Sequence, residues 1–364
     1  MICIQQQSGC RVYHDQPITL EAMLENSLDT PAERGVTDTR FEALHAWLEK
    51  QLPAVPFVVK PASADASFRR YFRVWSGDST YIAMDAPPGK EDCTPFISVA
   101  YRLRLNNIHA PAIHAKSPEQ GFLLLDDLGD RLYLSELNSQ TVDKLYGDAL
   151  DALLLMQNSV PAYDLPVYDR QLLLNEMNLF KHWFLQQHLH LKLDGDAEEI
   201  LNECFELLIA SALEQPSVFV HRDYHSRNLM LCDDNNPGIL DFQDAVYGPV
   251  TYDLVSLLRD CYVAWPKEQV QRWLKFYYAR LNENQLINVD YIKFERWFDW
   301  MGMQRHLKAI GIFARLNHRD GKSNFLNDIP RTYEYITGVC RHYPDLMSFS
   351  KLMAALQIHE RLAG

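Results

Sequence analysis

Hydrophobic spacing divides the chain into a strand-rich first part and a helix-rich second part. Short apolar runs between turn residues predict strands in the first part. They cover residues 57–60, 68–75, 81–84, 113–116 and 122–125. Turn-forming residues at 76–78 and 118–121 lie between neighbouring runs and therefore predict two β-hairpins.

Apolar residues spaced three and four apart predict helices on both sides of these strands. The predicted helices cover residues 41–52, 95–106, 145–156, 200–211, 270–277 and 291–316. Strands in one segment followed by helices in the next indicate the α+β class, with a hinge at residues 125–129. Residues 1–38 have weak periodicity, so we expect a poorly ordered N-terminal extension there.

Composition narrows the classes of protein that remain. The 364 residues are 47% hydrophobic and 23% charged, as in ordinary globular proteins. No apolar run approaches the length of a membrane span, and the first thirty residues lack the apolar stretch of a secretory signal. The seven cysteines are scattered without a C-x-x-C pair, which favours reduced thiols in a cytoplasm. A net charge of −13 argues against a general nucleic-acid binder.

The candidate chemistry lies in residues 221–244. An apolar run leads into His-Arg-Asp at 221–223, and Asn228 follows five residues after Asp223. A turn and a second apolar run then deliver Asp241, thirteen residues after Asn228, in an Asp-Phe-Gln-Asp sequence. His-Arg-Asp alone arises by chance, and Asp and Asn also cluster in turns. The full spacing instead favours phosphoryl transfer, which needs a carboxylate to orient the acceptor and an amide and a second carboxylate to hold magnesium.

These motifs resemble those of the aminoglycoside phosphotransferase superfamily, whose members have a protein-kinase-like fold. The resemblance runs from about residue 40 to the end and rests on H-x-D-x-x-x-x-N at 221–228 and L-D-F-Q-D at 240–244. Further segments resemble the bacterial N-acetylmuramate/N-acetylglucosamine anomeric kinases of cell-wall recycling. These segments are residues 63–74, 84–88, 304–308 and 311–316.

The resemblance implies a two-lobed fold and a kinase. Residues 39–127 would form a small antiparallel β-rich N-lobe that binds the nucleotide. Residues 128–364 would form a larger, mainly helical C-lobe that is catalytic and binds the acceptor. The activity implied is transfer of the γ-phosphoryl group of ATP, with Mg²⁺, to the anomeric hydroxyl of an amino sugar. The enzyme would act in the cytoplasm on a small molecule, without nucleic acid, membrane insertion or an obligate protein partner.

The resemblance also assigns roles by position. Asp223 would be the catalytic base, Asn228 and Asp241 would coordinate magnesium, and His221 would support the loop. Adenine would lie against the hinge backbone at residues 125–128. The implied cofactor-binding residues are Ser67, Phe68, Arg70, Met84, Asp126 and Leu128.

One departure from the kinase pattern concerns the cation that faces the phosphates. No lysine occurs at residues 82–84, where protein kinases have one, and the turn over the phosphates has no glycine. Arg69 or Arg70 in that turn could add a charge, and either Arg70 or Lys90 could replace the lysine, with Glu91 as a candidate partner. A nucleotide-binding pseudokinase is therefore an alternative.

The candidate acceptor residues belong to the long helix predicted at 291–316. They are Arg305, His306, Lys308 and Arg315. Arg305 and Lys308 share one face of that helix and could bind the lactyl carboxylate of N-acetylmuramate. A solvated basic face is the alternative for these residues. A kinase of another small alcohol, such as an aminoglycoside, choline or homoserine, also remains open, although a polycationic aminoglycoside would require an acidic cleft.

Overall fold

The structure, a computed structural model, describes residues 38–53, 55–64 and 68–363. The predicted extension over residues 1–38 lies outside this part, apart from Asp38. The chain divides into two compact units, residues 1–56 and residues 57–364. In the first unit, helix α2 (Thr39–Gln51) begins at Asp38, whose carboxylate accepts a hydrogen bond from the Phe41 amide at 3.0 Å.

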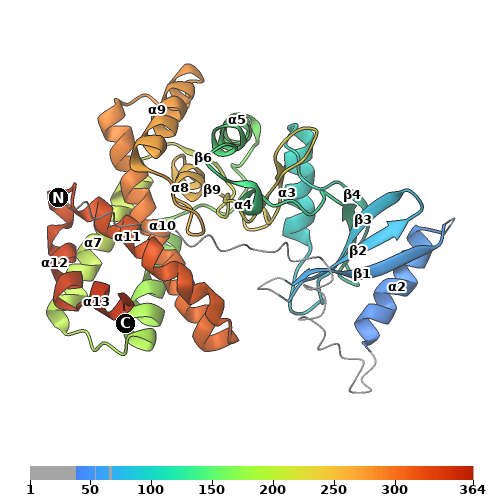
Figure 1. Cartoon of the computed structure of the whole chain (residues 1–364), viewed down its shortest axis with the longest axis horizontal. Helices are drawn as coiled ribbons and strands as arrows, with labels where there is room; N and C mark the ends of the chain where they lie inside the picture. Colours follow the sequence, from blue (N-terminus) through green and yellow to red (C-terminus); the bar gives the residue numbers. More distant parts are fainter. Residues whose placement is uncertain (1–37, 54, 65–67, 364) are drawn as a thin grey trace, which may run out of the picture. The chain divides into compact units, whose positions relative to one another are not determined.

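The second unit opens with a five-stranded antiparallel sheet (Figure 1). The strands are β1 (Phe57–Ala64), β2 (Arg70–Ser76), β3 (Ser79–Asp85), β4 (Ile113–Ser117) and β5 (Phe122–Asp126), in the order β1-β2-β3-β5-β4. Both predicted hairpins are present. In the first, Ser76 pairs with Ser79 and Gly77 takes a φ of 59°, a conformation that glycine adopts without a steric cost.

A helix connects the two hairpins and covers part of the core. Helix α3 (Thr94–Leu105) has Pro95 in its first turn, as predicted, and the Asp92 carboxylate accepts from the Thr94 amide at 2.8 Å. Phe96 and Leu103 on α3 are buried in a core that continues from the sheet into the helices that follow.

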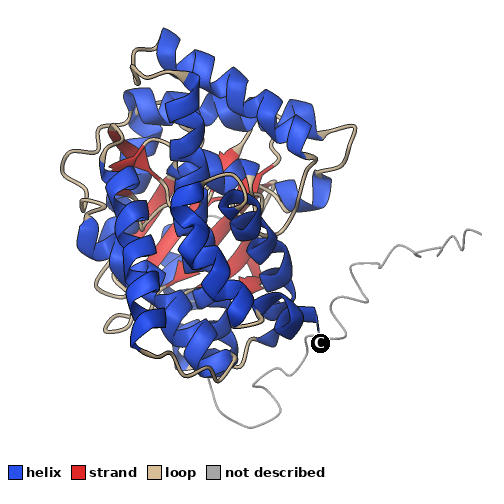
Figure 2. Cartoon of the chain, turned by 90° about the vertical axis from the view of Figure 1, so that its left-hand side faces the viewer, coloured by secondary structure: helices blue, strands red, loops and turns tan. Residues whose placement is uncertain are grey.

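The remainder of the chain is mainly helical (Figure 2). Its helices are α4 (Tyr133–Glu136), α5 (Val142–Ser159), α6 (Arg170–Leu179), η2 (Phe180–His188), α7 (Gly195–Leu213), α8 (Tyr252–Leu258), α9 (Lys267–Glu283), α10 (Tyr291–Asp320), η3 (Ser323–Asp328), α11 (Ile329–Cys340), η4 (Pro344–Leu346), α12 (Met347–Ala355) and α13 (Ile358–Ala363). No helix among the described residues is long and apolar enough to cross a membrane.

Four short strands frame the segment that carries the candidate chemistry. They are β6 (Ser217–Val220), β7 (Leu229–Met230), β8 (Gly238–Ile239) and β9 (Val246–Pro249). Strand β6 pairs with β9, and β7 pairs with β8, both antiparallel. Loops that leave these paired strands are therefore fixed at both ends, which positions the side chains between them.

The predicted α+β class is confirmed, with an antiparallel β-rich first part and a mainly helical second part. The lobe boundary at residues 127 and 128 stays a prediction. The helical region at 170–188 was not predicted. There α6 passes directly into η2, a wider π-type helix, and its apolar residues do not follow one helical period throughout.

Helix α10 is buried along much of its length. It packs against η2, α6, α7, α8 and α11. Figure 1 shows α11 beside it. Arg305 and Lys308 are buried together with the apolar residues of the same helix. The alternative of a solvated basic face is therefore wrong, because these side chains point into the protein.

A close backbone contact holds α10 against the α6–η2 region. A Cβ atom at Gly311 would lie 2.3 Å from the Leu179 carbonyl carbon and 2.5 Å from the Phe180 nitrogen. Real Cβ contacts are not this short, so any side chain at Gly311 would push the two backbones apart.

Gly311→Ala should lower the free energy of unfolding by about 1–3 kcal/mol, the usual range for overpacking. Thermal unfolding followed by circular dichroism would show the lower Tm. Gly338→Ala on α11 is the matched control, since a Cβ there meets nothing within 4 Å. The control should keep or raise Tm, because alanine has the higher helix propensity. An equal Tm for both variants would contradict the close-contact assignment.

Candidate active site

The loop that follows β6 is held by a buried carboxylate. Asp253, near the start of α8, accepts hydrogen bonds from the backbone amides of His221 at 2.6 Å and Arg222 at 3.0 Å. Burial raises the pKa of Asp253 to about 7 against the lowering effect of these amides. Arg222 has a φ of 77°, an uncommon conformation for a residue with a side chain. The two amide contacts therefore stabilise a strained turn immediately before Asp223.

The imidazole of His221 supports the loop from inside. Its Nε2 lies 3.0 Å from the Leu240 carbonyl oxygen, and its Nδ1 accepts from the Asp223 amide at 3.2 Å. These partners require a proton on Nε2 and a lone pair on Nδ1. Burial lowers the pKa of His221 to about 4, so the ring is neutral near pH 7. The ring thereby joins the two loops that carry Asp223 and Asp241.

A second carboxylate fixes the other half of the loop. Asp260 accepts from the Ser226 amide at 2.9 Å and from the Ser226 hydroxyl at 2.6 Å. Its other oxygen accepts from the Tyr262 amide at 2.8 Å. Both Ser226 and Asp260 are fully buried, so the segment between Asp223 and Asn228 has little freedom to move.

Asn228 and Asp241 lie side by side. The Asn228 amide nitrogen donates to the Asp223 backbone oxygen at 2.9 Å and reaches Asp241 Oδ2 at 3.4 Å. The Gln243 amide donates to Asp241 Oδ1 at 2.6 Å. Asp241 has a φ of 63°, a second uncommon backbone conformation within this site. The structure thus brings the two predicted metal ligands together.

This pair fits magnesium by its chemistry. Magnesium prefers oxygen ligands and is commonly held by one or two protein groups together with phosphates and water. The Asn228 carbonyl oxygen and the Asp241 carboxylate are such groups. Among the described residues, no cluster of three or more His, Cys, Asp or Glu side chains could hold a metal ion. A protein cage for a resident metal is therefore absent from that part of the chain, whereas a nucleotide-bound ion needs none.

Asp223 is surrounded by cations. Burial tends to raise the pKa of this carboxyl group, but neighbouring basic groups lower it to about 2. In order of their effect these groups are Lys308, His225, Arg305 and Arg222; burial lowers the pKa of His225, so the cations near pH 7 are Lys308, Arg305 and Arg222. Asp223 is therefore ionised throughout the neutral range, and two of its cations come from α10.

A buried carboxylate on α6 links the catalytic loop to α10. The Glu176 side chain accepts hydrogen bonds from Tyr168, Arg222 and Gln304 and forms an ion pair with Lys308. The Lys308 ammonium lies 3.1 Å from Glu176 and donates to the Tyr252 hydroxyl at 3.0 Å. Glu176 thus fixes Lys308 near Asp223.

Glu176 was not predicted from the sequence, although a signal was available. It shares one helix face with Leu173, Met177 and Phe180, all of which are buried. A carboxylate on an apolar helix face requires a buried partner.

Two of the predicted acceptor residues, His306 and Arg315, have their contacts outside the group of charges around Asp223. His306 Nε2 lies 2.9 Å from the Arg259 carbonyl oxygen, and its ring stacks on Tyr335 with centroids 4.7 Å apart. Burial lowers the pKa of His306 to about 3, as expected for a neutral core histidine. Arg315 is half-buried, and the charges that act on its guanidinium are those of Arg319 and Asp320. We therefore assign His306 to packing and place Arg305 and Lys308 at the site.

The predicted nucleotide residues of the sheet are spread over its strands. Ser67 lies outside the described residues. Phe68 is exposed, and Met84 is buried in the core. Arg70 binds Asp85, with Nε at 3.0 Å and Nη2 at 2.6 Å from the same oxygen.

The hinge that follows β5 is tied to its surroundings. The Asp126 carboxylate accepts from the Ala112 amide at 2.9 Å and lies 2.6 Å from His114 Nε2. The Leu128 carbonyl oxygen lies 3.8 Å from the Cys232 sulfur. The Asp126 side chain is thus engaged by Ala112 and His114. The groups of the hinge that could face the adenine of a nucleotide are therefore those of its backbone.

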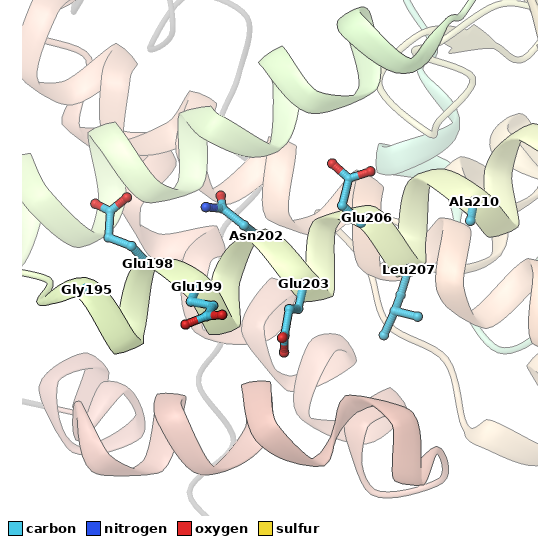
Figure 3. Close-up of a pocket in the computed structure, with 8 residues that line it drawn as sticks. All are labelled: Gly195, Glu198, Glu199, Asn202, Glu203, Glu206, Leu207 and Ala210. Atoms are coloured by element: carbon cyan, nitrogen blue, oxygen red, sulfur yellow. The ribbon is translucent and has the colours of Figure 1, made fainter.

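A surface hollow lies on another element, helix α7. A hollow of about 790 Å³ runs along α7 between Gly195 and Ala210 (Figure 3). The described residues that line it include four glutamates, and Figure 3 shows them projecting from successive turns of the helix. None of the residues discussed above lines this hollow. Its shape therefore provides no guide to the catalytic chemistry.

Comparison with known proteins identifies the class. The model of the phosphotransferase enzyme family matches residues 58–284, more than half of the chain. The chain belongs to this family and is a phosphotransferase with a small-molecule acceptor. It is similar to the N-acetylmuramate/N-acetylglucosamine kinases of Pseudomonas aeruginosa (45% identity, 88% of this chain and 97% of that protein) and Neisseria meningitidis (39%, 88% and 96%).

Solved structures support the kinase-like fold. A choline kinase from Streptococcus pneumoniae matches with a TM-score of 0.60 at 12% identity, over 82% of this chain and 100% of that one. An ADP-bound aminoglycoside phosphotransferase matches with a TM-score of 0.55 at 16% identity, over 82% and 98%. The protein-kinase-like fold predicted from the sequence is thereby confirmed. Membership in a family of kinases further implies a nucleotide as phosphoryl donor.

Lys308→Met should shift the pH dependence of the reaction. Lys308 is the cation that lowers the pKa of Asp223 most, so its removal raises that pKa from about 2. A base must be ionised to accept a proton, so the acid limb of kcat/KM against pH should move to higher pH. Lys293→Met, on the same helix but paired with Glu214, is the control and should leave the limb in place. An unshifted limb in Lys308→Met would argue against this electrostatic role.

Proposed function

We propose that this phosphotransferase transfers the γ-phosphoryl group of ATP to the anomeric hydroxyl of N-acetylmuramate or N-acetylglucosamine. The observation that carries the proposal is the juxtaposition of Asp223, Asn228 and Asp241 with the buried cations of α10. The similarity to kinases of these two sugars supports the acceptor class. On this proposal the enzyme acts in peptidoglycan recycling in the cytoplasm. The absence of disulfides among the described cysteines is compatible with that compartment.

Asp223 would orient the acceptor hydroxyl and accept its proton. The anomeric oxygen would then form a bond to the γ-phosphorus while the bond to the bridging oxygen of ADP breaks. Because Asp223 is ionised and held by a rigid loop, it needs no rearrangement to receive the proton. An anomeric hydroxyl is more acidic than other sugar hydroxyls, so a weak base suffices.

Asn228 and Asp241 would hold magnesium on the phosphates of the nucleotide. When bound, that ion offsets the negative charge of the transferring group. The Gln243 amide keeps Asp241 in place through its contact with Oδ1, and the Asn228 amide nitrogen is occupied by the Asp223 backbone. Because the nitrogen of the Asn228 amide is engaged by the Asp223 backbone, its carbonyl oxygen is the atom that would bind a cation.

Arg305 is the residue that we propose for recognition of the lactyl carboxylate of N-acetylmuramate. It is buried, its Nη1 lies 3.5 Å from the Cys261 sulfur, and its Nε has no hydrogen-bond partner among the described residues. A buried guanidinium with unused donors is suited to a carboxylate, which it can bind at two points. The buried cations near Asp223 also favour a neutral or anionic acceptor over a polycationic one.

Asp223→Asn should lower kcat by about 10²- to 10⁴-fold, the usual contribution of a catalytic base. Binding of ATP, measured by calorimetry, should be nearly unchanged because the nucleotide ligands remain. Asp233→Asn is the matched control, since Asp233 is exposed in the turn between β7 and β8. Near-normal turnover of Asp223→Asn, measured by ADP release with a panel of acceptors, would show that another group is the base. Nucleotide binding by the wild type without turnover of any acceptor would support a pseudokinase.

Arg305→Met should separate the two acceptors. Loss of a charge-assisted hydrogen bond should raise KM for N-acetylmuramate by about 10- to 100-fold. KM for N-acetylglucosamine, which has no carboxylate, should change much less. Steady-state kinetics should be measured with both sugars on one enzyme preparation. This controls for folding, because a misfolded fraction would affect both sugars alike. An equal rise of both KM values would assign Arg305 to the stability of the site instead of to carboxylate recognition.

A further inference from the structure

Two histidines from distant parts of the chain meet at the ends of two packed helices. His188 is the last residue of η2, and His318 lies in the last turn of α10. His188 Nδ1 lies 3.2 Å from His318 Nε2, and the ring centroids are 5.4 Å apart. The His188 ring is partly buried and stacks on Phe184 with centroids 6.0 Å apart, whereas His318 is exposed. The pair is therefore held by the protein on one side and reached by solvent on the other.

The backbones that carry the two rings are fixed relative to each other. Helix α10 packs against η2, and its backbone at Gly311 lies directly against Leu179 and Phe180, where η2 begins. Gly321, with a φ of 68°, ends α10 shortly after His318. Two ligands on fixed backbones lose little conformational freedom when they bind one ion.

The separation of the two nitrogens suits a metal ion. An imidazole nitrogen lies about 2.0–2.1 Å from a zinc ion that it binds. Two such ligands at the tetrahedral angle are about 3.3–3.4 Å apart, close to the 3.2 Å between His188 Nδ1 and His318 Nε2. Without an ion, one ring donates a hydrogen bond to the other across the same distance.

We propose that His188 and His318 form a binding site for a late first-row divalent metal ion such as Zn²⁺, which joins the end of η2 to the end of α10. Neutral imidazoles are preferred ligands of such ions. In the hydrogen-bonded pair one of the two facing nitrogens carries a proton. That proton moves through water to the outer nitrogen of the same ring, so both facing nitrogens bind the metal with no net change in protonation. Water completes the coordination, since no group of three His, Cys, Asp or Glu suited to a metal occurs in the described part of the chain.

The charges at this end of α10 limit the affinity of the site. Arg319, next to His318, is paired with Asp320 at 2.7 and 2.9 Å, which offsets its charge. Arg315, one turn before His318, is half-buried and adds a repulsive charge. We therefore expect weaker binding than in a closed structural zinc site with four protein ligands.

The test compares metal binding by single variants of the full chain. Calorimetry with ZnCl₂, without nucleotide and with excess MgCl₂ to occupy sites made of oxygen ligands, should show one Zn²⁺ bound per chain of wild type. His188→Gln and His318→Gln should each weaken this binding by at least about 10-fold, as expected when a group that holds a metal is removed. His182→Gln, which removes an exposed histidine from the same η2 helix, is the matched control and should bind as the wild type does.

Two further measurements identify the ligands and check folding. Electron paramagnetic resonance with Cu²⁺ should show nitrogen splitting from two imidazoles in the wild type and lose that pattern in both variants. Zinc should raise the Tm of the wild type, because the ion binds the folded state, and should leave the Tm of both variants unchanged. The Tm of each variant without metal shows whether it folds. His318 is exposed, so its variant decides the matter should His188→Gln fail to fold.

Three results would overturn the proposal. They are zinc binding that is equal in the wild type and both variants, loss of binding in only one of the two variants, and no saturable binding by the wild type. The proposal does not rest on the proposed function, so turnover of amino sugars by the wild type tests that function separately.

Discussion

Opposite charges buried together around Asp223 determine how the helices of this enzyme must pack. An unpaired charge in a protein interior costs several kcal/mol, and the cost falls only when partners lie close. Glu176 on α6 contacts Arg222 on the catalytic loop and Lys308 on α10. A displacement of any of these elements leaves a charge without its partner. The contacts that stabilise the packing thus also hold in place the cations that keep the Asp223 carboxylate ionised.

Much of the fold follows from local sequence, and the exceptions have physical causes. The two hairpins were predictable because Gly77 and Gly121 supply the positive φ that their turns require. The burial of α10 was not predictable, because Arg305 and Lys308 resemble the polar face of an amphipathic helix. Only partners distant in sequence, such as Glu176, make a buried position acceptable for these charges. Residues 170–188 gave no helical prediction for another reason, because α6 passes into the wider helix η2 and the apolar spacing changes there.

The residues of the candidate site also fall into a part that local sequence predicts and a part that it does not. Asp223, Asn228 and Asp241 lie within one short stretch, and their spacing identifies them because the loop geometry is local. The ion pairs of the sheet are a different case. Arg69 and Arg70 are neighbours in sequence, and neighbouring side chains in extended chain point to opposite faces, so one turns to Asp85 and the other to Glu91. Only the strand register reveals which residue faces which partner.

The burial of α10 has a consequence for how the chain folds. A helix with charged residues at interior positions is stable only after its neighbours are in place, since isolated helices gain little in water. Four of its partners, α6, η2, α7 and α8, precede it in the chain, and α11 follows it. During synthesis these four emerge first and can form the surface onto which α10 docks. Until that docking occurs, the catalytic loop lacks Lys308, so the active site is completed only at a late stage of folding.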